Sequence, residues 1–445
     1  MATSETMPDS PVTPTTTTAT ATVTTTSSYW TFRGHQVYTE KSTTNLPKQV
    51  DYPTNDNDKE QAETTTRTTT TRTRKKKTLV LLVHGFACSS TYWRETKRAL
   101  LQNQNHNNDN NNNSGGGHAY EVHSLDLLGQ GQSDKPGRAQ GIDYSIHLWA
   151  EQVDAYIKEN MIRTVSDDVN DDDDDPSVDT GPDIILCGNS LGSLVVLSAV
   201  TGDFKESKTM ATPGNDNDKN DHHHYWNHRC KGICMFNCGV GLNSRGIANE
   251  EQWTPFQRFL IHALYNVLDV LIFRNTALLA YVLDTVVTRD LLRRALVGLY
   301  PHRPDRVDDE LVDSFYHPAK DCGSVEALGQ IYTNEPGATP MDLHRKYGTY
   351  YSSSSSTMSW NGNSNNDKNK NNENKNTILD SIPIHLIWGD KDAVTPLIGG
   401  VGQYYQTMAL NRDHVSFQVV SAGHIPFDDN PIDSHESMVQ WLDQL

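Results

Sequence analysis

The chain of 445 residues is poor in cysteine, in apolar residues and in positive charge. Its six cysteines are scattered rather than spaced as a framework, which argues against a disulfide scaffold and indicates a reducing interior. Apolar residues make up only 35%, because runs of Thr, Asn and Asp dilute an otherwise ordinary core composition. The formal net charge of −18 argues against nucleic-acid binding.

Signals for secretion and for a membrane span are lacking as well. The first 28 residues are rich in Thr, contain Glu5 and Asp9 and lack Arg, so we expect a disordered leader over residues 1–28 and an intracellular protein, with plastid and cytoplasm both open. The longest apolar region, 259–287, is interrupted by charged residues. We therefore expect no transmembrane segment, with peripheral membrane contact left open.

A group of histidines and cysteines raises the possibility of a zinc site. His222 to His224 and His228 stand just before Cys230, Cys234 and Cys238. Their spacing matches no zinc-ligand pattern, and Cys234 and Cys238 fall in an apolar run that is typical of a buried strand. We expect core thiols here, and neither a metal nor a cofactor.

Short apolar runs alternate with helix-like segments along most of the chain. A hairpin is expected at 29–38. The predicted strands are 78–83, 120–125, 183–187, 232–238, 382–388 and 415–420, and the helices beside them are 91–101, 144–159 and 436–445. This alternation predicts an α/β fold with a mostly parallel central sheet covered by helices.

No strand pattern occurs between residues 243 and 346, where helices are expected at 256–270, 278–287, 289–299, 308–316 and 324–332. This predicts an all-helical cap inserted before the last strands. We expect most of its apolar side chains to pack on the core and a minority to line an acyl or prenyl channel. These side chains are Phe256, Leu260, Leu264, Leu271, Leu278 and Tyr281.

The resulting domain organisation has five parts. They are a leader at 1–28, a first part of the core at 29–243, a helical cap at 244–346, a polar loop at 347–377 and a second part of the core at 378–445. Low-complexity polar tracts at 103–117, 164–182, 203–228 and 352–376 each precede a predicted strand. They therefore belong to the amino ends of the strands, whereas ligands in such sheets bind at the carboxyl ends.

The sequence Gly188-Asn189-Ser190-Leu191-Gly192 is a G-x-S-x-G motif between a predicted strand and a predicted helix. This is the context of a nucleophile elbow, in which Gly188 and Gly192 let the two backbones approach and Ser190 is exposed at the apex. The alternative is a serine in an ordinary strand-to-helix turn. The rest of the chain must decide between them.

A base and an acid follow at the ends of later strands. His424, preceded by a glycine, comes after the last predicted strand, and Asp392 comes after the strand before it, with Asp390 as a competitor. The chain order Ser190, Asp392, His424 is that of the α/β-hydrolases. We expect activity to rise with pH as His424 loses its proton.

The first parallel strand ends in His84-Gly85-Phe86. Gly85 allows a close backbone approach there, so the N–H of Phe86 can point at a developing oxyanion. The N–H of Leu191, at a helix start, is the expected second donor.

Several segments together resemble the α/β-hydrolase superfamily: HGF, DLLGQGQSDKP, YSIHLWAEQV, GNSLGS, IWGDKD and AGH. WTFRGHQVYTE, YPHRPDRVDDELVDSF and NEPGATP resemble its pheophytinase-like branch, from which FNCGVGLNSRG departs. The resemblance implies a serine hydrolase that cleaves a lipophilic carboxylic ester through an acyl-enzyme intermediate. In some members of that branch the substrate is the phytyl ester of a chlorophyll derivative.

Other functions remain open on the same residues. A thioesterase, a carbon–carbon hydrolase or a perhydrolase can use the same three side chains, and a non-catalytic ligand-binding protein can keep the fold. Epoxide hydrolysis and dehalogenation are disfavoured, because such superfamily members place Asp at the elbow where Ser190 stands. The expected partner is a small-molecule ester.

Overall fold

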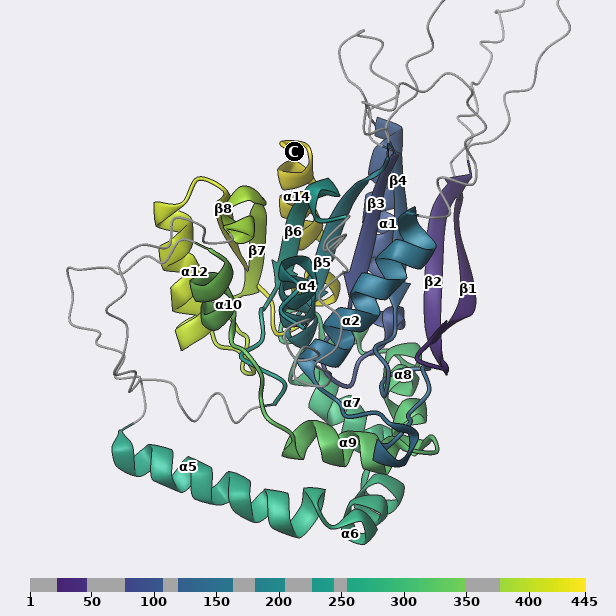
Figure 1. The fold of residues 1–445 in the computed structure, drawn as a ribbon, viewed down its shortest axis with the longest axis vertical. Coiled ribbons are helices and arrows are strands. Elements are labelled where there is room, and N and C mark those ends of the chain that lie inside the picture. The colour runs from purple at the N-terminus through teal and green to yellow at the C-terminus, as the bar shows by residue number, and fades with distance from the viewer. Residues whose placement is uncertain are drawn as a thin grey trace, which may run out of the picture.

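The computed structural model describes residues 22–45, 77–106, 119–162, 181–204, 226–243, 254–348 and 377–445 (Figure 1). The strands are β1 (Thr22–Phe32), β2 (His35–Asn45), β3 (Lys77–Val83), β4 (Ala119–Leu125), β5 (Asp183–Asn189), β6 (Cys230–Phe236), β7 (Ile384–Gly389) and β8 (Val415–Val420). The longer helices are α1 (Arg94–His106), α2 (Ile146–Tyr156), α4 (Leu191–Thr201), α5 (Pro255–Leu268), α6 (Thr276–Tyr281), α7 (Arg289–Val297), α8 (Asp309–Lys320), α9 (Ser324–Thr333), α10 (Pro340–Tyr347), α12 (Gly400–Asn411) and α14 (Pro431–Leu442). Shorter helical segments are η1 (Ser90–Trp93), η2 (Arg138–Gln140), η3 (Ile157–Ile162), η5 (Asn227–Arg229), η7 (Asp269–Phe273), η8 (Val282–Val286), η9 (Pro304–Arg306), α11 (Ile378–Ser381) and α13 (Pro426–Asp429).

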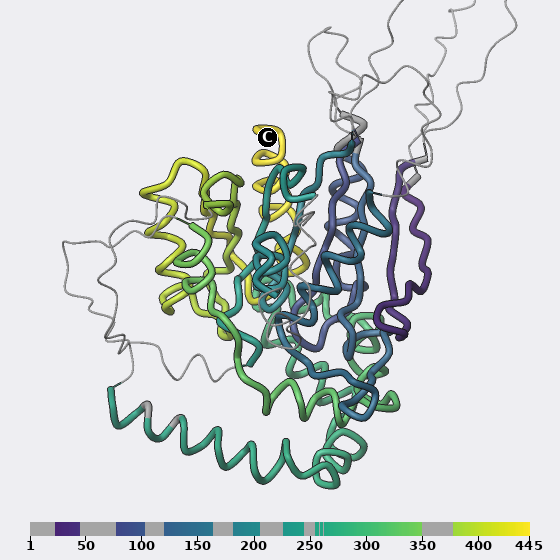
Figure 2. Tube along the Cα trace, in the orientation of Figure 1, coloured from purple at the N-terminus to yellow at the C-terminus, as the bar shows by residue number. Residues whose placement is uncertain are grey.

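One eight-stranded sheet runs through the molecule in the order β1-β2-β4-β3-β5-β6-β7-β8. The pairs β1–β2 and β2–β4 are antiparallel, and every pair from β4 to β8 is parallel. The N-terminal hairpin forms one edge and the segment after residue 377 forms the other (Figure 2). This confirms the predicted mostly parallel sheet covered by helices.

The hairpin is longer than predicted. β1 begins at Thr22, which pairs with Asn45, so residues 22–28 are strand and the expected leader boundary at residue 28 is wrong for them. The β-branched threonines in this segment favour an extended backbone once a partner strand is present. The two-residue turn is Arg33-Gly34, with φ of 50° and 83°. Positive φ at both positions suits the twist of a tight hairpin.

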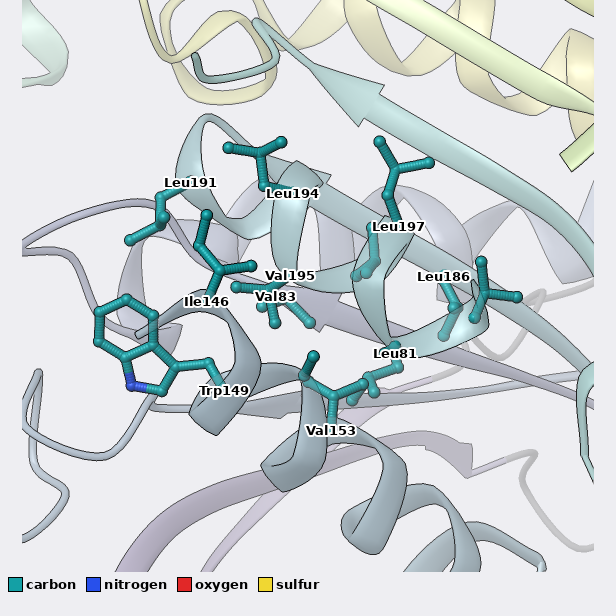
Figure 3. Close-up of a cluster of buried hydrophobic side chains, with 14 of the residues drawn as sticks. Leu81, Val83, Ile146, Trp149, Val153, Leu186, Leu191, Leu194, Val195 and Leu197 are labelled. Carbon is teal, nitrogen blue, oxygen red and sulfur yellow. The ribbon is translucent and has the colours of Figure 1, made fainter. Parts of the chain in front are cut away.

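Helices α2 and α4 pack on one face of the sheet over β3 and β5 (Figure 3). Every residue of α4 is buried, because its sequence is apolar on all sides and it has protein around it. The other face is covered by η1, α1 and α14. Trp93 of η1 and Trp441 of α14 are buried there with strand residues such as Val80. Ser190, at the start of α4, is therefore mounted on a helix enclosed by the core.

The described residues between 254 and 348 form helices and no strand. Helices α7, α8 and α9 lie at the end of the sheet from which α5 and α6 extend further outward (Figure 1). The division of the chain into core and cap domains stays a prediction.

The expectation that most apolar cap side chains pack on the core is wrong for the residues named. Phe256, Leu264 and Tyr281 are 68%, 58% and 58% exposed, and Leu260, Leu271 and Leu278 are exposed as well. The reason is that α5 runs out past the other helices, so protein does not cover its apolar face (Figure 1). By length and composition alone, Pro255–Phe273 is long and apolar enough to cross a membrane.

All six cysteines are free, and only Cys322 is exposed. Cys234 lies in β6, but Cys238 is buried two residues beyond that strand rather than within it. His222 to His224 lie outside the described residues, as do most of the four polar tracts. The first tract begins later than predicted, because α1 continues to His106.

Candidate active site

The turn between β5 and α4 places Ser190 in an unusual backbone conformation. Its φ is 52° and its ψ is −119°, a region that an ordinary residue occupies only when its surroundings enforce it. A Cβ on Gly192 would lie 2.2 Å from the carbonyl oxygen of Val83, and one on Gly188 would lie 2.6 Å from the backbone of Gly192. Glycine is needed at both positions because strand, turn and neighbouring strand touch there.

Asp392 and His424 are hydrogen-bonded. The Oδ2 of Asp392 lies 2.8 Å from the Nδ1 of His424, and both residues follow the carboxyl ends of adjacent strands, β7 and β8. With its proton on Nδ1, the His424 ring donates to Asp392 and keeps a lone pair on Nε2. Asp390 instead accepts the N–H of Ala422 at 3.1 Å. Of the two competing carboxylates, Asp392 is the one in contact with His424.

The carboxylate of Asp392 is held by further donors. Its Oδ2 also accepts from the Thr395 hydroxyl at 2.7 Å, and its Oδ1 accepts the N–H groups of Val394 and Thr395 at 2.7 and 3.1 Å. Burial acts to raise the pKa of Asp392, but the charge of His424 and these hydrogen bonds outweigh it and lower the pKa. Asp392 therefore stays ionised and orients the His424 ring.

Asn189, the residue before Ser190, ties the elbow to the His424 loop. Its Nδ2 donates to the carbonyl oxygens of Phe236 and His424, at 3.0 and 3.2 Å. Its Oδ1 accepts from the Tyr92 hydroxyl at 3.2 Å, and that hydroxyl accepts the N–H of Gly85 at 2.7 Å. One buried amide thus holds together the Ser190 turn, the His424 loop and the His84-Gly85-Phe86 turn.

His84 organises the turn after β3. Its Nδ1 donates to the carbonyl of Gly85 at 2.6 Å, and its Nε2 accepts the N–H of Leu127 at 2.9 Å. Burial lowers the pKa of His84, which keeps the ring neutral so that one nitrogen donates and the other accepts. His84 therefore joins the loops that follow β3 and β4.

One expected oxyanion donor, the N–H of Leu191, belongs to the elbow, and the other, the N–H of Phe86, belongs to the turn after β3. Within the part of the chain that the structure describes, neither the N–H of Phe86 nor that of Leu191 donates to a protein acceptor. Leu191 is the first residue of α4, where backbone donors have no partner within the helix. A Cβ on Gly85 would lie 3.2 Å from the carbonyl oxygen of Asn189, which shows how closely the two turns approach.

Among the described residues, no hydrogen bond joins the Ser190 hydroxyl to His424. The two loops are linked through Asn189, and His424 is 7% exposed. Catalytic hydrogen bonds are often long without substrate and tighten in the substrate complex. A serine hydroxyl, an imidazole and a carboxylate on neighbouring loops are the types of group that acyl transfer uses.

Residues 80–434 match the model of the alpha/beta hydrolase family. The chain belongs to this family. Among solved structures it is similar to a laboratory-evolved variant of the potato epoxide hydrolase StEH1, with a TM-score of 0.51 and 11% identity over 95% of this chain and 100% of that one. It is also similar to a hydrolase from Pseudomonas aeruginosa, with a TM-score of 0.47 and 12% identity over 94% and 98% of the two chains. Identity this low shows the fold alone, and the comparison with curated proteins gives no match.

The sequence reasoning missed a residue of the hydrolase that holds Asp392 in place. Asn237 is fully buried, its Nδ2 donates to the Oδ2 of Asp392 and to the carbonyl of Gly423, and its Oδ1 accepts the N–H of Gly389. Its φ is 44°, a conformation that Asn tolerates better than most residues. The sequence feature that could have identified Asn237 is its position directly after the buried strand β6.

Two buried acids follow His424 and connect its loop to the helices of residues 289–306. Asp429 accepts the N–H groups of Gly423 and Arg303 at 2.8 and 2.7 Å. Asp428 binds Arg306 at 2.8 Å and the hydroxyl of Tyr300 at 2.9 Å. Residues 300–306 are therefore held close to the loop that carries His424.

An open surface cavity of about 690 Å³ lies between the N-terminal hairpin and α1 of the hydrolase. Its walls include Val23, Tyr38 and Arg94, and none of the candidate catalytic residues lines it. Its cations are engaged, since Arg94 pairs with Asp308 and Lys97 with Glu40. This cavity has no place in the chemistry at Ser190.

Proposed function

We propose that this hydrolase cleaves a lipophilic carboxylic ester through an acyl-enzyme intermediate on Ser190. The observation that carries the proposal is the buried Asp392–His424 pair, joined through Asn189 to a strained turn with Ser190 at its apex. An acid, an imidazole with a free nitrogen and a hydroxyl in one place are what serine acyl transfer requires.

The steps follow from the roles of these groups. His424 takes the Ser190 proton as Oγ attacks the ester carbonyl, and the N–H groups of Phe86 and Leu191 stabilise the oxyanion. His424 then gives its proton to the departing alcohol. A water molecule deprotonated by His424 next attacks the acyl-enzyme, and the carboxylic acid leaves as Ser190 regains its proton.

The lipophilic character of the substrate is supported by the rings beside the oxyanion turn. Phe86 packs edge-on against Tyr332 at 5.5 Å, and Tyr332 stacks on Phe273 at 4.0 Å. Apolar walls with few polar groups suit an acyl or prenyl chain. A thioester would meet the same groups and is the second candidate.

A fluorophosphonate probe tests the nucleophile. We expect covalent labelling of the wild type and none of Ser190→Ala. Ser198→Ala is the matched control, because Ser198 lies in the same helix and its buried hydroxyl has no partner among the described residues. Labelling that persists in Ser190→Ala, or no labelling of the folded wild type, overturns the proposal.

Turnover of p-nitrophenyl esters of increasing chain length and of matched thioesters then tests the substrate class. We expect kcat/KM to rise with acyl length and the oxygen esters to be preferred. Hydrolysis confined to the shortest esters contradicts a lipophilic substrate, and preference for the thioesters selects the second candidate.

A further inference from the structure

The most unusual surface of the molecule is a row of exposed apolar side chains on α5 and η7, here called the α5 stripe. Its members are between 49% and 68% exposed. They are Phe256, Phe259, Leu260, Leu264, Val267, Val270 and Leu271. Contiguous apolar surface of this kind marks an interaction site in a folded protein.

The spacing of the α5 stripe places it on one side of the helix. Successive members are one, three or four residues apart, and at about 100° per residue all seven fall within less than half of the helix circumference. Asp269 lies on the opposite side, is only 6% exposed and pairs with Arg274 at 3.1 Å. At its C-terminal end the segment thus turns its polar side to the protein and its stripe outward.

Charge distinguishes this region from the rest of the chain. Residues 254–299 contain five arginines and three aspartates, which gives a formal charge of +2, whereas the whole chain carries −18. A lipid surface with anionic head groups attracts such a segment and repels the remainder. Arg274, Arg289 and Arg293 are 60%, 49% and 37% exposed, although they pair with Asp269, Asp313 and Asp309. An exposed apolar face followed by such arginines is typical of helices that lie in a membrane interface.

The end of the α5 stripe is continuous with the candidate site. Phe273 closes η7, and its ring stacks on Tyr332, which in turn contacts Phe86. Aromatic contacts therefore connect the exposed helix to the oxyanion turn. This step rests on the proposed function: an enzyme that cleaves a lipophilic ester meets its substrate at a lipid surface.

We propose that the α5 stripe docks this hydrolase on an anionic lipid surface. The helix lies in the plane of the interface, with Phe259, Leu264 and their neighbours among the acyl chains. It does not span the layer, because polar positions such as His262 and Asp269 occupy its other side. The 19 residues Pro255–Phe273 extend over about 28 Å at 1.5 Å per residue.

Vesicle flotation with full-length Ser190→Ala protein tests the docking without hydrolysis. The vesicles are phosphatidylcholine alone or phosphatidylcholine with phosphatidylglycerol. We expect binding to the mixed vesicles, weaker binding to the neutral ones, and a loss of at least about 100-fold in affinity when Phe259→Glu and Leu264→Glu are added. The matched control carries Leu410→Glu and Ile432→Glu, at positions 86% and 74% exposed on α12 and α14, and we expect it to bind as its parent does.

Three results overturn the docking. The first is that the folded parent does not bind the mixed vesicles. The second is that the α5 variant binds them as tightly as its parent. The third is that the parent sediments as an oligomer and the α5 substitutions convert it to a monomer, which would assign the stripe to a second copy of the chain. Hydrolysis of a short soluble ester by the Ser190-containing α5 variant separates the two proposals. Retained hydrolysis with lost flotation supports both, whereas retained flotation in a chain without esterase activity contradicts only the proposed function.

Discussion

The loops that carry the candidate site lie toward the same end of the molecule as α5 and η7, together called the α5 arm (Figure 1). The side chains of the two regions have opposite surroundings. Asn237 and Asp392 are 0% and 5% exposed, and their polar atoms bind several protein groups. In the α5 arm, the apolar side chains of Phe256 and Phe259 are 68% and 67% exposed. The polar groups of the candidate site are satisfied by the protein itself, whereas the apolar side chains of α5 are, by the docking proposal, covered by a lipid surface.

This contrast has a physical basis. Acyl transfer gains rate only if its donors and charges are already in place when the oxyanion forms, so the site must be fixed by the protein itself. An apolar docking face gains its free energy only on contact with another apolar phase, so it must stay uncovered until then. Four predictions test this contrast between a site fixed by protein contacts and an uncovered apolar face.

The largest effect is expected at Asp392. Asp392→Asn removes the charge that orients the His424 ring, and we expect kcat for a soluble ester to fall about 10⁴-fold with little change in KM. Asp390→Asn is the matched control, since that carboxylate contacts only the N–H of Ala422 among the described residues. Its kcat is expected to change by less than about tenfold. An equal fall in kcat in the two variants would contradict the role of Asp392 in orienting His424.

Much of this site could be predicted from the sequence, because each candidate directly follows an apolar run. Ser190, Asp392 and His424 come at the ends of β5, β7 and β8, and parallel strands bring those ends to one edge of a sheet. Asp392 is favoured over Asp390 in the sequence because it lies further into the loop, and the structure places Asp392 against His424. Both follow the strand within three residues, and only the loop path decides which one meets His424.

Asn237 could not be assigned in advance because its contacts are distant in sequence. Its partner Asp392 is 155 residues away, and the contact depends on the register of β6 against β7. The exposure of α5 was missed for a different reason. Helical periodicity shows which side chains share a face, but it does not show what covers that face.

The second largest effect is expected in the pH dependence of stability. Burial lowers the pKa of His344 from 6.5 to about 4, and its Nε2 lies 3.2 Å from the Tyr405 hydroxyl. Between these pH values the unfolded chain binds a proton at this residue that the folded chain does not bind, so stability falls as pH decreases. We expect this residue to contribute about 3 kcal/mol to the fall between pH 6.5 and 4.

Urea unfolding of His344→Gln across this pH range measures that contribution. The variant should show a shallower decline than the wild type. His317→Gln is the control, because the side chain of His317 is 64% exposed on α8. Parallel curves for wild type and His344→Gln would mean that His344 takes up its proton in the folded state as readily as in the unfolded one.

A smaller effect is expected at Asn237, which acts on Asp392 rather than on substrate. Asn237→Ala removes two donors and one acceptor from buried partners, so we expect stability to fall by about 1–3 kcal/mol and kcat to fall about 10- to 100-fold. Asn237→Asp places a second carboxylate beside the Asp392–His424 pair. The added negative charge favours the protonated imidazole, so the acid limb of the activity profile, which follows the loss of the His424 proton, shifts to higher pH.

The control for this positioning role is Asn243→Ala. Asn243 is also buried beyond β6, but its Nδ2 donates to the carbonyls of Ile331 and Asn334 rather than to the Asp392 region. It should lower stability without moving the pH profile. An acid limb that is unchanged in Asn237→Asp would reduce Asn237 to a structural role.

The smallest effect is expected in the α5 arm. Leu264 is 58% exposed, so Leu264→Ala should change the free energy of unfolding in buffer by less than about 0.5 kcal/mol. Leu194→Ala, in the fully buried helix α4, should cost about 2–5 kcal/mol, because it leaves a cavity in the core (Figure 3). With vesicles the order should reverse. Leu264→Ala should weaken vesicle binding, because Leu264 is then buried in lipid, and Leu194→Ala should not weaken the binding of the folded protein. A cost of several kcal/mol for Leu264→Ala in buffer would mean that the arm already packs on protein, and the contrast between the two regions would fail.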